Sequence, residues 1–138
     1  MEFRIVKCTA YLKKVNDGRR IDTTRDREGN IDGAEYVWWD EENKCYQQKE
    51  AEFDGVSDFV KTYYKKTDKD FSGVIVGEKD IVASAILYAD TNYDFRGYEY
   101  SYIGKQAKEV IKCAIVYYGN NRKRYVPLEC ISEIGGKL

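Results

Sequence analysis

Apolar and polar side chains alternate along most of the chain, which is the period of a β-strand with one buried face. Residues 3–12 follow this pattern, and so do residues 34–39 and 44–50. The polar stretch 40–43 separates the last two, so we predict a β-hairpin there, with aromatic side chains paired across its strands.

Two stretches near the N-terminus lack this alternation. Residues Asn16–Gly18 read Asn-Asp-Gly, which is a strong turn signal. Residues 19–33 are polar and punctuated by glycine, a composition that predicts either a long loop or a weak hairpin.

One segment has helical spacing instead. Between Asp54 and Thr67, apolar residues recur three and four positions apart. Asp54 or Ser57 would cap the N-terminus of a helix, and the two lysines near its end suit the helix dipole. The pattern therefore predicts one α-helix near residues 55–66.

The second half of the chain predicts a meander of strands. Gly119–Asn121 marks a tight turn between the last two, since Gly and Asn tolerate positive φ. A long strand, this turn and a closing strand resemble the last hairpin of an SH3-like barrel, which implies a small antiparallel barrel or strongly bent sheet in roughly the second half of the chain. The predicted strands cover residues 73–78, 81–89, 98–103, 109–118 and 123–131.

These elements predict a mainly β (α+β) protein with one domain, residues 1–138. A chain of 138 residues is the ordinary size of a domain and buries enough surface to fold without a metal or a disulfide. Within it we expect N-terminal strands and a hairpin over residues 1–54, the helix over 55–66 and the meander over 73–134.

Charge and composition narrow the possible functions. The 23 basic and 24 acidic residues leave a formal net charge of −1, whereas proteins that bind duplex DNA usually carry a basic excess. The chain has no histidine, which excludes histidine acid–base catalysis, Ser-His and Cys-His dyads and histidine metal sites. We therefore expect neither a nucleic-acid ligand nor an enzyme. No apolar run approaches the length of a membrane span, so we expect no membrane association.

The four cysteines do not form a CxxC motif. Cys8, Cys113 and Cys130 each share an alternating apolar face, so we expect them to be buried thiols, whereas the pattern around Cys45 leaves its burial open. No apolar signal segment stands at the N-terminus, and we expect the reducing cytoplasm as the location.

One stretch has the spacing of metal ligands. Asp68, Asp70, Ser72 and Gly73 match the first positions of a calcium loop, but Lys79 occupies the position where such a loop needs a bidentate glutamate. Aspartate also forms turns without any metal. We therefore expect no metal site and no cofactor.

The first candidate ligand site is the cationic run at residues 122–124. Guanidinium groups beside aromatic rings bind phosphate and stack on bases, and here Arg122 and Arg124 would act with Tyr118 and Tyr125. The alternative is that these charges form the solvated tip of a hairpin.

Two further clusters combine arginine with hydroxyl or aromatic groups. The loop after Gly18 would either close over a phosphate-bearing ligand or neutralise its own charges with its carboxylates; its cations are Arg19, Arg20, Arg25 and Arg27. Farther along, Tyr98, Tyr100 and Tyr102 project from one strand face near Arg96, as a stacking platform for bases, a core or a subunit interface.

Together these clusters favour a non-enzymatic binding protein that grips a small anionic, nucleotide-type ligand with arginine and tyrosine side chains. A phage or bacterial accessory protein that sequesters a nucleotide signal would have this character. The alternative is a protein-interaction module or inhibitor that blocks a partner protein or enzyme. Exposed strand edges also predict a homo-oligomer.

Overall fold

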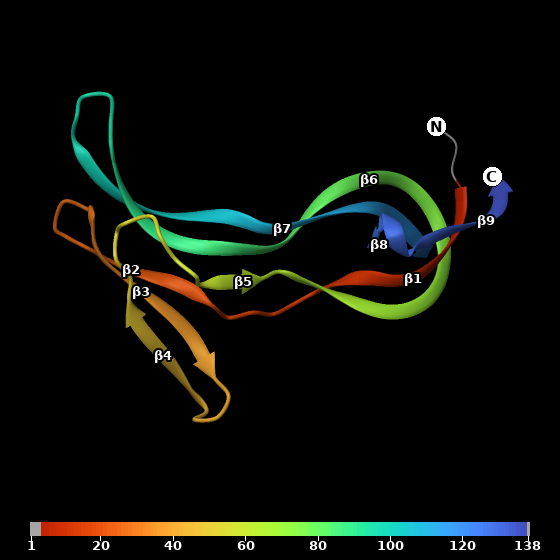
Figure 1. Ribbon diagram of the computed structural model, residues 1–138, viewed down its shortest axis with the longest axis horizontal. Coiled ribbons are helices and arrows are strands. Elements are labelled where there is room, and N and C mark those ends of the chain that lie inside the picture. Colours follow the sequence, from red (N-terminus) through yellow and green to blue (C-terminus); the bar gives the residue numbers. More distant parts are fainter. Residues whose placement is uncertain (1–3, 138) are drawn as a thin grey trace. The chain divides into compact units, whose positions relative to one another are not determined.

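A computed structural model describes residues 4–137 and shows a mainly β protein without an α-helix in that range (Figure 1). The only helical segment described is a short 3₁₀-helix, η1. The elements are β1 (Arg4–Lys14), β2 (Arg20–Arg25), β3 (Ile31–Asp40), β4 (Cys45–Glu50), β5 (Val60–Thr62), β6 (Tyr64–Tyr93), β7 (Glu99–Gly119), β8 (Arg122–Pro127), η1 (Leu128–Cys130) and β9 (Ile131–Lys137).

The strands form two antiparallel sheets. One has the order β5-β6-β7-β8-β1-β9, and the other, of three strands, has the order β2-β3-β4. Strand β1 also pairs with β6, from Arg4 opposite Ile75 to Lys14 opposite Tyr64. The hydrogen bonds of β1, β6, β7 and β8 therefore close on themselves like a ring.

The chain divides into two compact units. Unit 1 comprises Met1–Val15, Tyr63–Ala83 and Glu109–Leu138, and unit 2 comprises Asn16–Thr62 and Ser84–Lys108. The long strands β6 and β7 contribute residues to both units.

The core of unit 1 follows from the alternation in β1, whose residues Val6 and Cys8 are completely buried. They pack with Val116 of β7 and Val126 of β8 in one apolar cluster. Strand β6 approaches this core closely at Gly73, where an added Cβ would lie 2.5 Å from both the Tyr117 carbonyl oxygen and a methyl group of Val116. The glycine is therefore required by packing density.

Unit 2 has a core built on small side chains, in which Ala34, Ala51 and Ala89 are buried. Larger residues, among them Tyr36 and Phe53, pack partly buried around them. Because alanine fills little volume, most aromatic surface of this unit remains partly or wholly accessible. Accessible aromatic side chains of this unit line the candidate site described below.

Several predictions are confirmed. The hairpin over residues 34–50 is present as β3 and β4, and Trp39 lies directly opposite Tyr46, with ring centroids 5.0 Å apart. Residues 20–25 and 31–40 form the weak hairpin that was one alternative for the polar N-terminal stretch. The thiols predicted to be buried, those of Cys8, Cys113 and Cys130, are buried.

The predicted α-helix near residues 55–66 is wrong. Asp54 and Ser57, its expected caps, each accept one backbone N–H bond at 2.9 Å, but within turns. Residues 60–62 instead pair with β6, and Tyr64 begins the stretch of β6 that pairs with β1. Pairing with existing strands satisfies these backbone groups, so tertiary context overrides the helical spacing.

The predicted strands were also too short and too many. Residues 73–78 and 81–89 belong to the single strand β6, and residues 98–103 and 109–118 lie almost wholly in the single strand β7. Asn16–Gly18 lies in an irregular connection without a turn. The part of the chain that the structure describes contains no helix able to span a membrane.

Candidate functional site

One hollow in unit 2 has a volume of about 320 Å³. It lies beside strands β3 and β4 and the irregular segment before β5. We call it the ring-and-cation groove, and its lining residues are Arg19, Tyr36, Trp38, Lys49, Asp58 and Phe59.

Three aromatic rings form one wall of the groove. Tyr36 and Trp38 are two residues apart on β3, so they project from the same face of the strand. Phe59 packs against both, with its centroid 4.9 Å from that of Tyr36 and 6.3 Å from that of Trp38. All three are partly buried, which leaves ring surface open to a ligand.

Arg19 is held at the edge of this wall. Its guanidinium carbon lies 5.9 Å from the Phe59 ring centroid, and its Nη1 donates a 2.8 Å hydrogen bond to the Val60 carbonyl. The Asp17 carboxylate fixes the backbone, accepting 2.9 Å bonds from the N–H groups of Arg19 and Thr62. The cation is therefore positioned by the fold before any ligand arrives.

The remaining charges of the groove are unpaired within the described residues. Lys49 stands opposite Tyr36 in the β3–β4 pair, and both Lys49 and Asp58 are exposed. Neither forms an ion pair or hydrogen bond with another described side chain. A second hollow of about 440 Å³ shares Tyr36, Lys49 and Asp58 and extends the groove along Glu50 to Ser57.

The ring-and-cation groove places an aromatic surface beside two cations, Arg19 and Lys49, and one carboxylate, Asp58. Aromatic rings stack on planar ligands, while arginine and lysine bind anionic oxygens. A volume of about 320 Å³ lies at the small end of the range for ligand pockets, which begins near 300 Å³. The arrangement therefore suits a small planar ligand that carries a negative charge.

Of the four arginines predicted to form a loop site, Arg19 alone lines the groove. Arg20 makes a 2.8 Å ion pair with Asp22, and this hydrogen bond raises the pKa of the Arg20 guanidinium. Arg25 donates a 2.8 Å bond to the Gly29 carbonyl, and Arg27 is exposed. The other three cations therefore serve the loop itself or face solvent.

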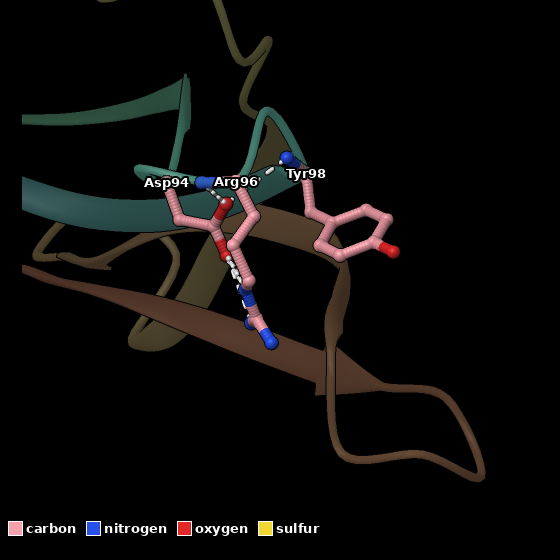
Figure 2. Close-up of polar contacts among 3 residues, drawn as sticks. All are labelled: Asp94, Arg96 and Tyr98. Atoms are coloured by element: carbon pink, nitrogen blue, oxygen red, sulfur yellow. Dashed lines mark hydrogen bonds and ion pairs between the residues drawn. The ribbon is translucent and has the colours of Figure 1, made fainter.

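The turn between β6 and β7 carries the predicted residues Arg96 and Tyr98 (Figure 2). The Asp94 carboxylate accepts bonds from the backbone N–H groups of Arg96, at 2.8 Å, and Tyr98, at 3.0 Å. It also forms a 3.0 Å ion pair with the Arg96 guanidinium. Burial works to raise the pKa of Asp94, but the hydrogen bonds from Tyr98 and Arg96 outweigh it and hold that pKa below its ordinary value.

The Arg96 guanidinium is therefore paired with Asp94 within its own turn, while the aromatic rings beside it are exposed to solvent. Phe95 is 96% exposed and Tyr98 is 66% exposed, and the Arg96 guanidinium lies 5.5 and 5.1 Å from their ring centroids. Tyr100 lies on β7, with its ring centroid 5.9 Å from that of Tyr102. These rings form an exposed aromatic tip.

The predicted residues of the C-terminal hairpin lie in unit 1. The Arg124 guanidinium is stacked among Tyr11, Phe71 and Tyr118, whereas Arg122 is exposed. Tyr125, on the other face of β8, packs edge-on against Tyr64, and Lys79 and Lys123 lie 5.7 and 5.6 Å from its ring centroid. Arg124 is therefore not a freely solvated charge at the tip of the hairpin.

Two of the buried thiols, those of Cys8 and Cys113, have a raised pKa. Burial raises the pKa of Cys8; Cys130 adds to this effect, and Arg124 opposes it. Burial raises the pKa of Cys113 to about 11, with smaller contributions from Asp80 and Cys130. Because the thiolate is the attacking species, thiols with raised pKa react slowly at neutral pH.

Sequence reasoning missed five of the six groove residues. Tyr36 and Trp38 were assigned to a strand with the correct alternation, so their shared face was available as a signal. Asp58 and Phe59 were hidden because their segment was assigned to a helix. No local signal marks Lys49, since its place opposite Tyr36 depends on the register of the hairpin.

Comparison of the chain with protein-family models, with curated proteins and with solved structures gives no match. Among the described residues, no group of three or more cysteine, aspartate or glutamate side chains is arranged to hold a metal ion.

Proposed function

We propose that this protein is a non-enzymatic binding protein for a small anionic ligand of the nucleotide type, held in the ring-and-cation groove. The observation that carries the proposal is the presence of three aromatic rings and two cations around one hollow. The rings would stack on the base, and Lys49 and Arg19 would bind the phosphate. Asp58 would accept hydrogen bonds from N–H groups on the base.

Thermal unfolding with a nucleotide panel tests this proposal. The probes are the four ribonucleoside monophosphates, each compared with its nucleoside. A ligand at a hundred times its Kd stabilises the folded state by about 2.7 kcal/mol, so at least one monophosphate should raise Tm, and its nucleoside should raise it less. If none of the monophosphates raises Tm, the proposal is wrong.

Matched variants locate the effect. Lys49→Ala removes an exposed cation from the groove and should abolish most of the Tm increase. Arg27→Ala removes one exposed cation of unit 2 that does not line the groove, and should leave the increase unchanged. If Arg27→Ala abolishes the increase while Lys49→Ala does not, the ligand does not bind in the groove.

The exposed aromatic tip supports a second candidate function, the binding of a partner protein. Aromatic anchors that enter a pocket of the partner dominate the binding energy of many interfaces. Phe95 is 96% exposed at a turn that Asp94 holds by hydrogen bonds, so it is presented without much further ordering cost. A partner would offer an apolar pocket to Phe95.

Capture experiments distinguish this candidate. A partner retained by the wild-type protein and by Arg27→Ala, but lost by Phe95→Ala, would support the tip as an interface. A set of captured proteins that is the same for both variants would count against it. Arg27 is the matched control because it occupies the equivalent position in a second turn of unit 2.

We further propose that the ring of strands in unit 1 is a small SH3-like barrel. Its support is the closure of β1, β6, β7 and β8, together with the β7–β8 hairpin. An experimental structure in which β1 and β8 do not pair would contradict this assignment.

A further inference from the structure

Arg124 occupies an unusual position for a charged residue. It pairs with Val116 in the antiparallel β7–β8 register, and directly opposed residues share one face of a sheet. Val116 and Val126, two residues farther along β8, are both completely buried in the core of unit 1. Arg124 therefore extends from the core-facing side of its strand, where cations are rarely found without a partner.

Three aromatic rings enclose this cation, and we call the arrangement the arginine box. The guanidinium carbon lies 3.9 Å from the ring centroid of Tyr118, 4.2 Å from that of Tyr11 and 4.6 Å from that of Phe71. Both tyrosine rings meet Phe71 edge-on, at interplanar angles of 88° and 71°. The box satisfies the charge through the ring faces and fixes the guanidinium in one place.

The box leaves the N–H groups of Arg124 unused. No described carboxylate or carbonyl accepts a hydrogen bond from them, in contrast to Arg20, Arg25 and Arg96. No buried side-chain nitrogen in the described residues lacks a partner, so these donors reach solvent. The side chain is thus immobilised by its rings and still has its donors free.

We propose that the arginine box is an oxyanion receptor that binds a phosphate monoester through the edge of the Arg124 guanidinium. Two parallel N–H groups would donate to two phosphate oxygens, the geometry for which arginine is suited. Arg122, exposed two residues earlier on β8, supplies a second cation, which favours a dianionic phosphate over a carboxylate. Since the rings already hold Arg124, binding loses little side-chain entropy.

This site is separate from the proposed nucleotide groove. All residues of the arginine box belong to unit 1, and all residues of the groove belong to unit 2. Lys49→Ala should therefore leave phosphate binding at the box unchanged. The inference does not depend on the function proposed for the groove.

The test is a titration of the full chain with phenyl phosphate, followed through the arginine Nε–Hε resonances and by calorimetry. The Arg124 resonance should shift saturably. Arg124→Lys keeps the charge but loses the planar fork, and should weaken binding at least about tenfold, the factor that corresponds to about 1.4 kcal/mol. Arg27→Ala removes an exposed cation of unit 2 and should bind as the wild type does.

Three outcomes would overturn the proposal. The first is an Arg124 resonance that does not respond to phenyl phosphate. The second is equal affinity in Arg124→Lys, which would indicate a simple point charge. The third is equal binding of phenylacetate, which would show that the site does not select phosphate. If Arg124→Lys does not fold, the wild-type resonance still decides the first and third outcomes.

Discussion

Two turns of unit 2 have the same backbone hydrogen bonds but different tips. In the turn Asp26–Asn30, the Asp26 N–H donates to the Asn30 carbonyl at 2.9 Å, and the Gly29 N–H donates to the Asp26 carbonyl at 3.1 Å. The corresponding bonds in the turn Asp94–Tyr98 are 2.9 and 3.0 Å long. The two turns therefore have the same pattern of backbone hydrogen bonds.

The side chains that determine this turn are also the same. The first aspartate of each turn accepts two backbone N–H bonds through Oδ1, from the third and fifth residues, at 2.8 to 3.0 Å. The fourth residue is a glycine with positive φ, +85° at Gly29 and +87° at Gly97. An aspartate at the first position and a glycine at the fourth are sufficient to explain both turns.

The side chains differ at the second, third and fifth positions. One turn carries Arg27, Glu28 and Asn30 there, and the other carries Phe95, Arg96 and Tyr98. Phe95 is 96% exposed although the turn would form without it, as the first turn demonstrates. The partner binding proposed above would give this exposed ring a role that the turn itself does not.

The largest effect should come from removing either aspartate. Asp94→Ala removes the acceptor of the two N–H bonds in its turn, so the Arg96 and Tyr98 amides should lose all protection from hydrogen exchange. Asp26→Ala should do the same to Glu28 and leave the other turn protected. Persistent protection in either variant would show that the aspartate does not determine the turn.

The glycines should give the next largest effect, equal in the two turns. Gly97→Ala and Gly29→Ala should each destabilise by about 1 kcal/mol, because an L-residue in the left-handed region costs roughly 1–2 kcal/mol and gains back some unfolded-state entropy. No atoms crowd either position, so conformation is the only cost. Gly18→Ala, with no positive φ, is the control and should be nearly neutral in urea unfolding.

The third largest effect should be a weakening of the Asp94–Tyr98 turn at low pH. The folded-state pKa of Asp94 is lowered from 3.8, so its contribution to order is complete above pH 3.8 and is lost as the pH falls through the lower folded-state value. The Tyr98 amide shift should therefore titrate below pH 3.8. Arg96→Ala should move this midpoint upward, because it removes the ion pair. A midpoint at or above 3.8 in the wild type would contradict the assigned hydrogen bonds.

The smallest effect on stability should come from substitutions at the second position of each turn, Phe95 and Arg27. Phe95→Ala should change the free energy of unfolding by no more than about 0.5 kcal/mol, since the side chain is almost fully exposed. Arg27→Ala should behave alike. A substantial loss of stability in Phe95→Ala alone would mean that the ring packs within the protein, and the comparison between the two turns would fail.

The sequence predicted those features that depend on near neighbours. Alternation identified β1 and the β3–β4 hairpin. The Gly119–Asn121 turn was predicted because Gly and Asn tolerate positive φ, and Asn121 has a φ of +62°. The spacing of apolar residues gave a wrong prediction around Phe59, where β5 and the start of β6 follow instead of a helix. The deciding interactions there are pairings with β6 and β1, which lie far along the chain.

The candidate sites were less predictable for the same reason. Arg124 was identified as a candidate, but its rings come from Tyr11, Phe71 and Tyr118, on three other strands. The groove depends on Lys49 standing opposite Tyr36, a matter of register that one sequence does not specify. Residue types indicated the chemistry, while long-range pairing decided which residues meet.

The division of unit 1 into three chain segments has a consequence for synthesis. Both segments of unit 2 end by Lys108, whereas the last segment of unit 1 begins at Glu109. The Thr9 hydroxyl donates a hydrogen bond to the Cys130 carbonyl, 121 positions later, and β1 pairs with β8 and β9. These partners of β1 are synthesised long after β1 itself. At about 5–20 residues per second on the ribosome, β1 lacks its partners on β8 and β9 for several seconds after it has been synthesised.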